Sequence, residues 1–319
     1  MEKRIVTQFS AQRGVALIMV LGMVAIIAAW ASTAAYEDMI SIRRATNMQD
    51  EVRATMANES AWVASRIAFK EDQNNPLLGT PDYDSLEDLW TQIPPWPLDD
   101  GLVAATIEDS NRYYNLNDLV DDKGVIIQAH FTQLQDMFIN LGLNGNLVFA
   151  LADWMDKNDI PHGAAGAEDS SYYSQDYEVK NARLDNWSEL KLIQGFDTEV
   201  LTKLKTAAAV YPSKSNGSSS ININTANAET LMALFPDMTL LDFETIDTDR
   251  PYETKADINL ANQPWAKGGD QNRLSVKSDT FMLRVHASFG QANVREEFLL
   301  SRSGSNVQLI RRERQGWQF

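Results

Sequence analysis

An uncharged segment near the N-terminus constrains the fold of this 319-residue chain more than any other feature. The 21 residues from Val15 to Ala35 include no Asp, Glu, Lys or Arg, and a helix of that length extends about 30 Å, enough to cross a bilayer. Three basic residues and one acidic residue precede the segment, whereas Glu37 and Asp38 follow it. Because cytoplasmic flanks carry the excess of Lys and Arg, we expect a single-pass protein with a cytoplasmic N-terminus and an exported remainder.

The composition excludes several classes of function. The chain contains no cysteine, which excludes disulfides, thiolate metal sites and cysteine nucleophiles. Its three histidines are scattered along the sequence and do not indicate a His-based zinc site. A formal net charge of −16 argues against nucleic-acid binding and suits a hard cation. Nucleophile-elbow, phosphate-loop and dinucleotide-binding motifs are also missing from the sequence, so we expect a protein that is not an enzyme.

The uncharged segment continues into a long amphipathic pattern. No glycine or proline interrupts residues 23–75, and apolar residues recur there every three to four positions or at close multiples, as on one helix face. We therefore predict one helix from Val15 to about Phe69, on the order of 80 Å long. Its apolar face is expected to hold partner helices by burying apolar area. The residues predicted to pack against partner subunits are Met19, Met48, Val52, Met56 and Val63.

Two processing sites compete in this region. Small residues at Ala29 and Ala31 would suit an ordinary signal peptidase. Residues 12–18, Gln-Arg-Gly-Val-Ala-Leu-Ile, instead resemble the class III signal of type IV pilins and pseudopilins. That resemblance implies cleavage by a prepilin peptidase between Gly14 and Val15 and methylation of the new N-terminus. The continuous helix favours this second site, because a cleaved signal peptide has no reason to be joined to a long rod.

The remaining chain indicates an α+β fold. We expect a short helix at 85–92, a strand at 102–116 and an antiparallel meander of three strands at 280–288, 294–301 and 307–314. Helical signals fill the intervening stretch, and a serine-rich segment at 213–220 is predicted to be a mobile loop. The expected helices cover residues 126–140, 147–157, 187–194, 198–210 and 228–235.

Several short motifs, in this order, resemble the minor pseudopilin K family of type II secretion systems. They lie at residues 112–117 (Arg-Tyr-Tyr-Asn-Leu-Asn), 152–161, 166–173, 188–190 and 221–231. Met19 stands where most pseudopilins carry a glutamate, as expected of a subunit with no neighbour above it, because a buried unpaired carboxylate is costly. The resemblance implies a long N-terminal helix and a pilin-like antiparallel sheet with a large inserted all-α domain. The expected parts are a leader (1–14), a stem helix (15–70), an αβ body (71–116 and 275–319) and an inserted α-domain (117–274).

The same resemblance implies a location and a set of partners. The chain would be anchored in the bacterial inner membrane, with its bulk in the periplasm, at the tip of the pseudopilus. There it would initiate or cap assembly with the I and J pseudopilins. Further partners would be the H and G pseudopilins, the prepilin peptidase, and the secretin or an exported substrate. Two alternatives stay open: a minor pilin of a type IV pilus, and a signal-anchored periplasmic calcium-binding module or enzyme.

An acidic loop is the strongest candidate for site chemistry. Seven acidic residues and one lysine lie between Asp153 and Glu178, and clustered carboxylates favour calcium, which takes six to eight oxygen ligands. The family resemblance also implies calcium in the inserted domain. The predicted ligands of one or two calcium ions are Asp156, Asn158, Asp159, Glu168 and Asp169. In the alternative interpretation, Asp153 and Asp156 face solvent while Asp159 and Asp169 only cap turns.

A segment at 222–234 resembles helix-hairpin-helix modules that hold the DNA backbone. Its turn, Phe-Pro-Asp-Met at 235–238, lacks the glycines whose amides meet phosphate in those modules. Residues 221–260 contain eight acidic and two basic side chains, which disfavours binding to phosphates. We therefore expect this segment to have a packing role and the chain to bind no nucleic acid.

Overall fold

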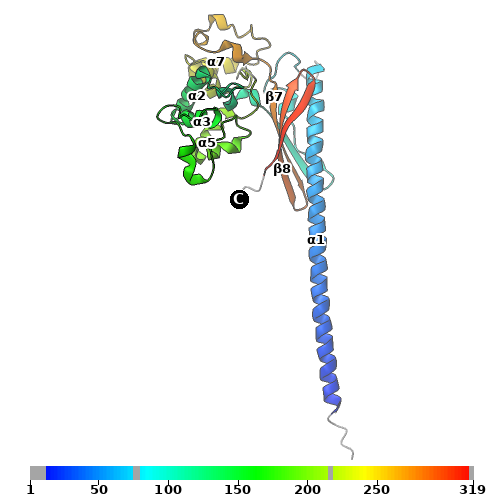
Figure 1. The fold of residues 1–319 in the computed structure, drawn as a ribbon. Coiled ribbons are helices and arrows are strands. Elements are labelled where there is room, and N and C mark those ends of the chain that lie inside the picture. Colours follow the sequence, from blue (N-terminus) through cyan, green and yellow to red (C-terminus); the bar gives the residue numbers. More distant parts are fainter. Residues whose placement is uncertain (1–11, 75–79, 215–217, 316–319) are drawn as a thin grey trace, which may run out of the picture.

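The computed structural model describes residues 12–74, 80–214 and 218–315, and one long helix dominates it (Figure 1). Helix α1 (Gln12–Asn74) runs for 63 residues without a break, which confirms the predicted rod. One end projects freely, and the other lies along a sheet. From Gly14 onward the helix is long and apolar enough to cross a membrane. The predicted leader lies mostly outside the described residues.

A five-stranded antiparallel sheet packs against the far end of α1. Its strand order is β1-β2-β7-β8-β9, so the predicted C-terminal meander is confirmed and extended by two earlier strands. Along β7, side chains on one face are buried in alternation, as expected when one face of a strand meets a helix. The strands are β1 (Trp96–Leu98), β2 (Gly101–Asp109), β7 (Thr280–Phe289), β8 (Ala292–Ser303) and β9 (Asn306–Arg314).

Small side chains allow α1 to lie close to this sheet. Ala54, Ala57 and Ala61 of α1 are buried where the helix meets the sheet. Near the end of α1, the Phe69 ring centroid lies 4.6 Å from that of Phe281 on β7. Helix α1 and the sheet thus share one apolar core. Trp90, from the segment that connects α1 to the sheet, also belongs to it.

Two sequence predictions in the body were wrong. The strand predicted over 102–116 ends at Asp109, because the Asp109 carboxylate accepts the Asn111 amide hydrogen and starts a turn. The helix predicted over 85–92 is only a single 3₁₀ turn at Leu89–Thr91. There Asp88 accepts the Ser85 amide hydrogen, so a side chain closes the preceding turn in place of a helical backbone bond.

Between β2 and β7 the chain forms a helical region on the opposite side of the sheet from α1 (Figure 1). The helices predicted at 126–140, 147–157 and 228–235 are confirmed with slightly shorter bounds. Helix α7 was not predicted, although Thr239 and Asp242 form a capping box at its start. The helices are α2 (Gln128–Asn140), α3 (Leu147–Met155), α4 (Asp169–Tyr172), α5 (Thr198–Leu204), α6 (Ala228–Leu234) and α7 (Leu240–Asp249).

Two further predicted helices are shorter than expected, and one of them is cut short by a parallel ladder. The segment predicted as a helix at 187–194 is a 3₁₀ helix at Trp187–Leu192. The helix predicted at 198–210 stops at Leu204, because β4 (Ala208–Ala209) pairs with β3 (Tyr114–Asn115). A second ladder joins β5 (Ile221–Asn222) to β6 (Leu274–Ser275).

A buried polar network organises this helical region. Arg273 Nη2 lies 2.6 Å from Asp118 Oδ2, and the two side chains are almost fully buried. The Ser219 amide and hydroxyl also donate to Asp118. The predicted mobile loop at 213–220 is therefore wrong at Ser219, which is buried, whereas residues 215–217 lie outside the described residues.

Candidate functional site

Helix α1 has two different faces along the sheet. The alanines that pack on the sheet and the large apolar residues Val52 and Met56 lie on different sides of the helix, about 100–180° apart at 100° per residue. The residues predicted for subunit packing are all exposed. Their exposed fractions are 69% for Met48, 49% for Val52, 65% for Met56 and 48% for Val63. This outer stripe is available to another helix.

The apolar half of α1 is not buried by any part of the chain that the structure describes. Met19 is 59% exposed, and a side chain placed at Gly14 would have nothing within 4 Å. A glycine inside a helix costs about 1 kcal/mol relative to alanine, so packing in this chain gives no reason for Gly14. Val15 is also exposed, at 52%. The processing site between Gly14 and Val15 stays a prediction. Both residues are accessible, as cleavage there would require.

The acidic loop begins where α3 ends. Asp156 is the C-cap of α3 and adopts an extended backbone, so the helix stops there. Asp153, one turn earlier, is fully buried and accepts hydrogen bonds from the amides of His162 (2.8 Å) and Ala167 (2.6 Å). A Cβ at Gly166 would clash with the Asp153 carboxylate. The loop is therefore folded back onto the helix end by a buried carboxylate.

Glu168 lies inside this loop in an unfavourable electrostatic environment. Its side chain is 5% exposed, and its Oε1 atom is buried with no hydrogen-bond partner among the described residues. Burial raises the pKa of Glu168 to about 7. Repulsion from four neighbouring carboxylates adds to this shift. They belong to Asp153, Asp156, Asp159 and Asp169.

The predicted acidic ligands lie around Glu168, but each of the others already accepts a hydrogen bond within the chain. Asp156 accepts from both nitrogens of Asn158, and Asn158 in turn accepts the Ile160 amide. Asp169 accepts the Val179 amide. Asp159 accepts from an asparagine side chain, at 3.4 Å. Within residues 12–74, 80–214 and 218–315, no three acidic or histidine side chains converge closely enough to hold an ion. Sequence reasoning also left Asp153 out of the ligand set, although it is buried at the centre.

A second buried acidic group was not predicted at all. Asp84 and Asp109 lie where the sheet meets the helical region, and Arg302 of β8 forms an ion pair with Asp84. Asp109 accepts hydrogen bonds from Ser278 and Thr225, and burial raises the pKa of Asp109 to about 6. Ser278 and Thr225 are 169 and 116 positions away from Asp109 in the sequence, in polar segments without a distinctive motif. No local pattern in the sequence could have found the group.

A single long N-terminal helix lies on one antiparallel sheet, and a large helical region is inserted between strands β2 and β7. Residues 113–213 match the family described as Type II secretion system (T2SS), protein K. The chain is 26% identical to the type II secretion system protein K of Pectobacterium carotovorum subsp. carotovorum, covering 97% of this chain and 98% of that protein. The corresponding protein of Klebsiella pneumoniae is 27% identical, with 94% and 96% covered.

A solved structure shares the fold. It is the crystal structure of the GspK-GspI-GspJ complex from the type 2 secretion system of enterotoxigenic Escherichia coli. The match has a TM-score of 0.71 at 24% sequence identity and covers 86% of this chain and all of the matched chain. The resemblance to the K family that the sequence motifs predicted is therefore confirmed, as is the mixed α and β fold.

Proposed function

We propose that this chain is a non-enzymatic minor pseudopilin at the tip of a type II secretion pseudopilus. The observation that carries the proposal is the two-faced α1, which buries small residues on its own sheet and leaves Val52, Met56 and Val63 for a partner helix. Similarity to proteins K over nearly the full length supports the secretion system. The partners proposed are the I and J pseudopilins, because the matched fold was solved in a complex of those three proteins.

Two features support the proposed position at the tip: the shape of the chain and the apolar half of α1. The helical region lies beside the end of α1 that is distant from the apolar segment, where it would obstruct addition of another subunit (Figure 1). Met19 offers no carboxylate to the N-terminus of a neighbour inside the helix bundle. Anchoring in the inner membrane, a periplasmic bulk and contacts with H, G, the secretin or an exported protein belong to the same proposal.

Co-purification in detergent tests the proposed subunit contact. Met56→Glu places a charge in the outer stripe and should abolish recovery of I and J with this chain, because a buried unpaired charge is costly. Ile160→Glu is the matched control, since Ile160 is 73% exposed and belongs to the helical region, between α3 and α4. Retention of both partners by the Met56 variant would show that the stripe is not the interface.

The N-terminus of the mature protein tests the processing step and separates the alternatives. The proposal expects a mature chain that begins at N-methylated Val15, and Gly14→Val should leave the leader attached. A chain that begins at Ser32 would instead indicate an ordinary signal peptide. Co-purification with pilus subunits in place of secretion subunits would identify a type IV minor pilin.

We also propose that the acidic loop binds calcium. The orphaned Oε1 of Glu168 among four like charges fits a divalent cation, which would remove the repulsion that raises the pKa of Glu168. Glu168, Asp156, Asp159 and Asp169 would supply carboxylate oxygens, and Asn158 an amide oxygen. Binding requires Asp156 and Asn158 to exchange their mutual hydrogen bonds for the ion. The bound ion would hold the loop to the end of α3.

Thermal unfolding in EDTA and in calcium tests this site. Saturation at about 100 times the dissociation constant stabilises the folded state by about 2.7 kcal/mol, so the melting temperature should rise. Glu168→Gln should remove the rise, and Glu178→Gln, at an exposed acid nearby, should keep it. An unchanged melting temperature of the wild-type chain would refute the calcium site.

A further inference from the structure

A cleft of about 690 Å³ lies between the outer face of the sheet and the helical region. Strands β7, β8 and β9 form one wall. Residues 187–191 and 205–211 contribute to the other wall. The volume falls in the range of pockets that enclose drug-sized ligands. The partner contacts proposed above for α1 do not involve this cleft, which lies on the opposite side of the sheet.

The sheet wall of the cleft is electrically satisfied. Arg284 forms ion pairs with Glu108 and Glu297 on the strands beside it. Arg311 pairs with Glu313 at 2.8 Å along the edge strand β9. The carboxylates on this wall are therefore neutralised within the chain, and the wall presents little net charge to a ligand.

The opposite wall carries cations without counter-charges. Lys191 and Lys205 are exposed, and neither forms an ion pair with any residue that the structure describes. The full lining contains five lysines or arginines and three glutamates, an excess of two positive charges in a chain of net charge −16. A strongly acidic protein thus concentrates free positive charge at one cleft, which favours an anionic occupant.

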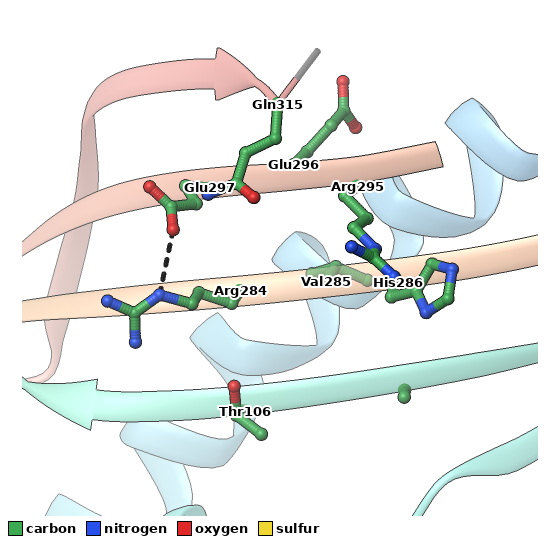
Figure 2. A pocket seen from close by; sticks show the side chains of 9 residues that line it. Thr106, Arg284, Val285, His286, Arg295, Glu296, Glu297 and Gln315 are labelled. Atoms are coloured by element: carbon green, nitrogen blue, oxygen red, sulfur yellow. Dashed lines mark hydrogen bonds and ion pairs between the residues drawn. The ribbon is translucent and has the colours of Figure 1, made fainter. Parts of the chain in front are cut away.

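The sheet surface beside the cleft carries one further cation. A shallow depression of about 190 Å³ shares Arg284, Glu297 and Gln315 with the cleft. Figure 2 shows the Arg284–Glu297 hydrogen bond and, on neighbouring strands, His286 and Arg295 side by side. Within the described part of the chain, Arg295 forms no ion pair, and it is exposed. It is a third free cation on the same surface.

We infer that this surface binds an extended acidic peptide segment of a partner protein. The free cations stand on three separate elements, so they match carboxylates spaced along a segment better than one compact phosphate. Apolar and aromatic side chains between them, Tyr113, Trp187 and Met282, would contact the apolar residues of such a segment. Four consecutive residues at 208–211 line the cleft, and the first two are alanines. Their small side chains leave room for an extended backbone.

Fluorescence anisotropy with a defined probe tests the inference. The probe is a fluorescein-labelled, end-capped peptide in which four glutamates alternate with leucines, and its control replaces every glutamate with lysine. Both are titrated with the full chain in detergent micelles at low and moderate salt, with empty micelles as blank. The acidic peptide should bind, more weakly at higher salt because exposed charges are screened, and the lysine peptide should not.

Charge reversal locates the binding. The double variant Lys191→Glu, Lys205→Glu should lower the affinity for the acidic peptide at least about tenfold, and Arg295→Glu should lower it less. Lys267→Glu, an exposed lysine outside the cleft, is the control and should change nothing. Equal binding by the double variant would overturn the inference. So would binding seen only in a chain that ends at Gln315, because residues 316–319 would then be the occupant. The assay contains no other pseudopilin, so its outcome is independent of the proposed assembly.

Discussion

The body and the helical region bury their residues by different means. In the body, α1 and the sheet share a core of alanines, phenylalanines and other apolar side chains, and the buried Arg302–Asp84 ion pair lies at the junction with the helical region. The helical region has a larger apolar core but also encloses the Arg273–Asp118 ion pair, which is bound to Ser219 and to the Tyr114–His130 pair. Long periodic elements define the first region, whereas long-range polar contacts fix the short elements of the second. Stability in the two regions should therefore respond to different substitutions.

The largest effect is expected at the buried ion pair. Arg273→Ala leaves the fully buried Asp118 carboxylate without its cation, and loss of one partner of such a pair costs about 3–5 kcal/mol. Chemical denaturation of the full chain in detergent measures the loss. Lys203→Ala is the matched control, because its pair with Glu199 is exposed on a helix surface and should contribute less than about 1 kcal/mol.

An equal, small cost for both variants would remove the distinction between the two regions. It would mean that Asp118 is sufficiently satisfied by the Ser219 amide and hydroxyl. A loss confined to Arg273→Ala would show that the helical region depends on a contact between residues 155 positions apart.

A smaller effect separates the two faces of α1. Ala57→Leu inserts extra volume where the helix meets the sheet, and overpacking of this kind costs about 1–3 kcal/mol. Val63→Leu, on the exposed outer stripe, should leave the free energy of unfolding of the isolated chain within about 0.5 kcal/mol. If the two substitutions had the same cost, the assignment of an inner and an outer face would be wrong.

Sequence patterns predicted the elements whose residues repeat at a fixed period. The rod of α1 and the three-stranded meander are of this kind, and their bounds were close. Periodicity could not tell which face of α1 meets the sheet, since both the alanine face and the large apolar face are apolar. It also missed positions where a side chain ends an element, as Asp109 does for β2.

The acidic loop was found from its charge density, but its geometry was not. Composition locates Glu168 among acids, whereas its burial depends on Asp153 folding the loop over the end of α3. Likewise, the unpaired state of Lys191 and Lys205 depends on which strands face them across the cleft. Such features arise from contacts between distant segments and leave no trace in a local pattern.

The smallest expected effect concerns the junction between the two regions and depends on pH. Asp109 is buried, and its pKa is raised to about 6, above its ordinary value near 3.8. The folded state therefore binds this proton more readily than the unfolded state, so ionised Asp109 weakens the fold above pH 6 and protonation relieves that cost below it. Lowering the pH from 7 to 5 should thus stabilise the chain through this group, by on the order of 1 kcal/mol.

Asp109→Asn should remove this component from the measured pH dependence of unfolding, whereas Asp82→Asn, at an exposed acid, should retain it. An identical pH dependence in wild type and Asp109→Asn would mean that the hydrogen bonds from Ser278 and Thr225 hold Asp109 ionised throughout. The junction would then be held by a charge, as the helical region is at Asp118.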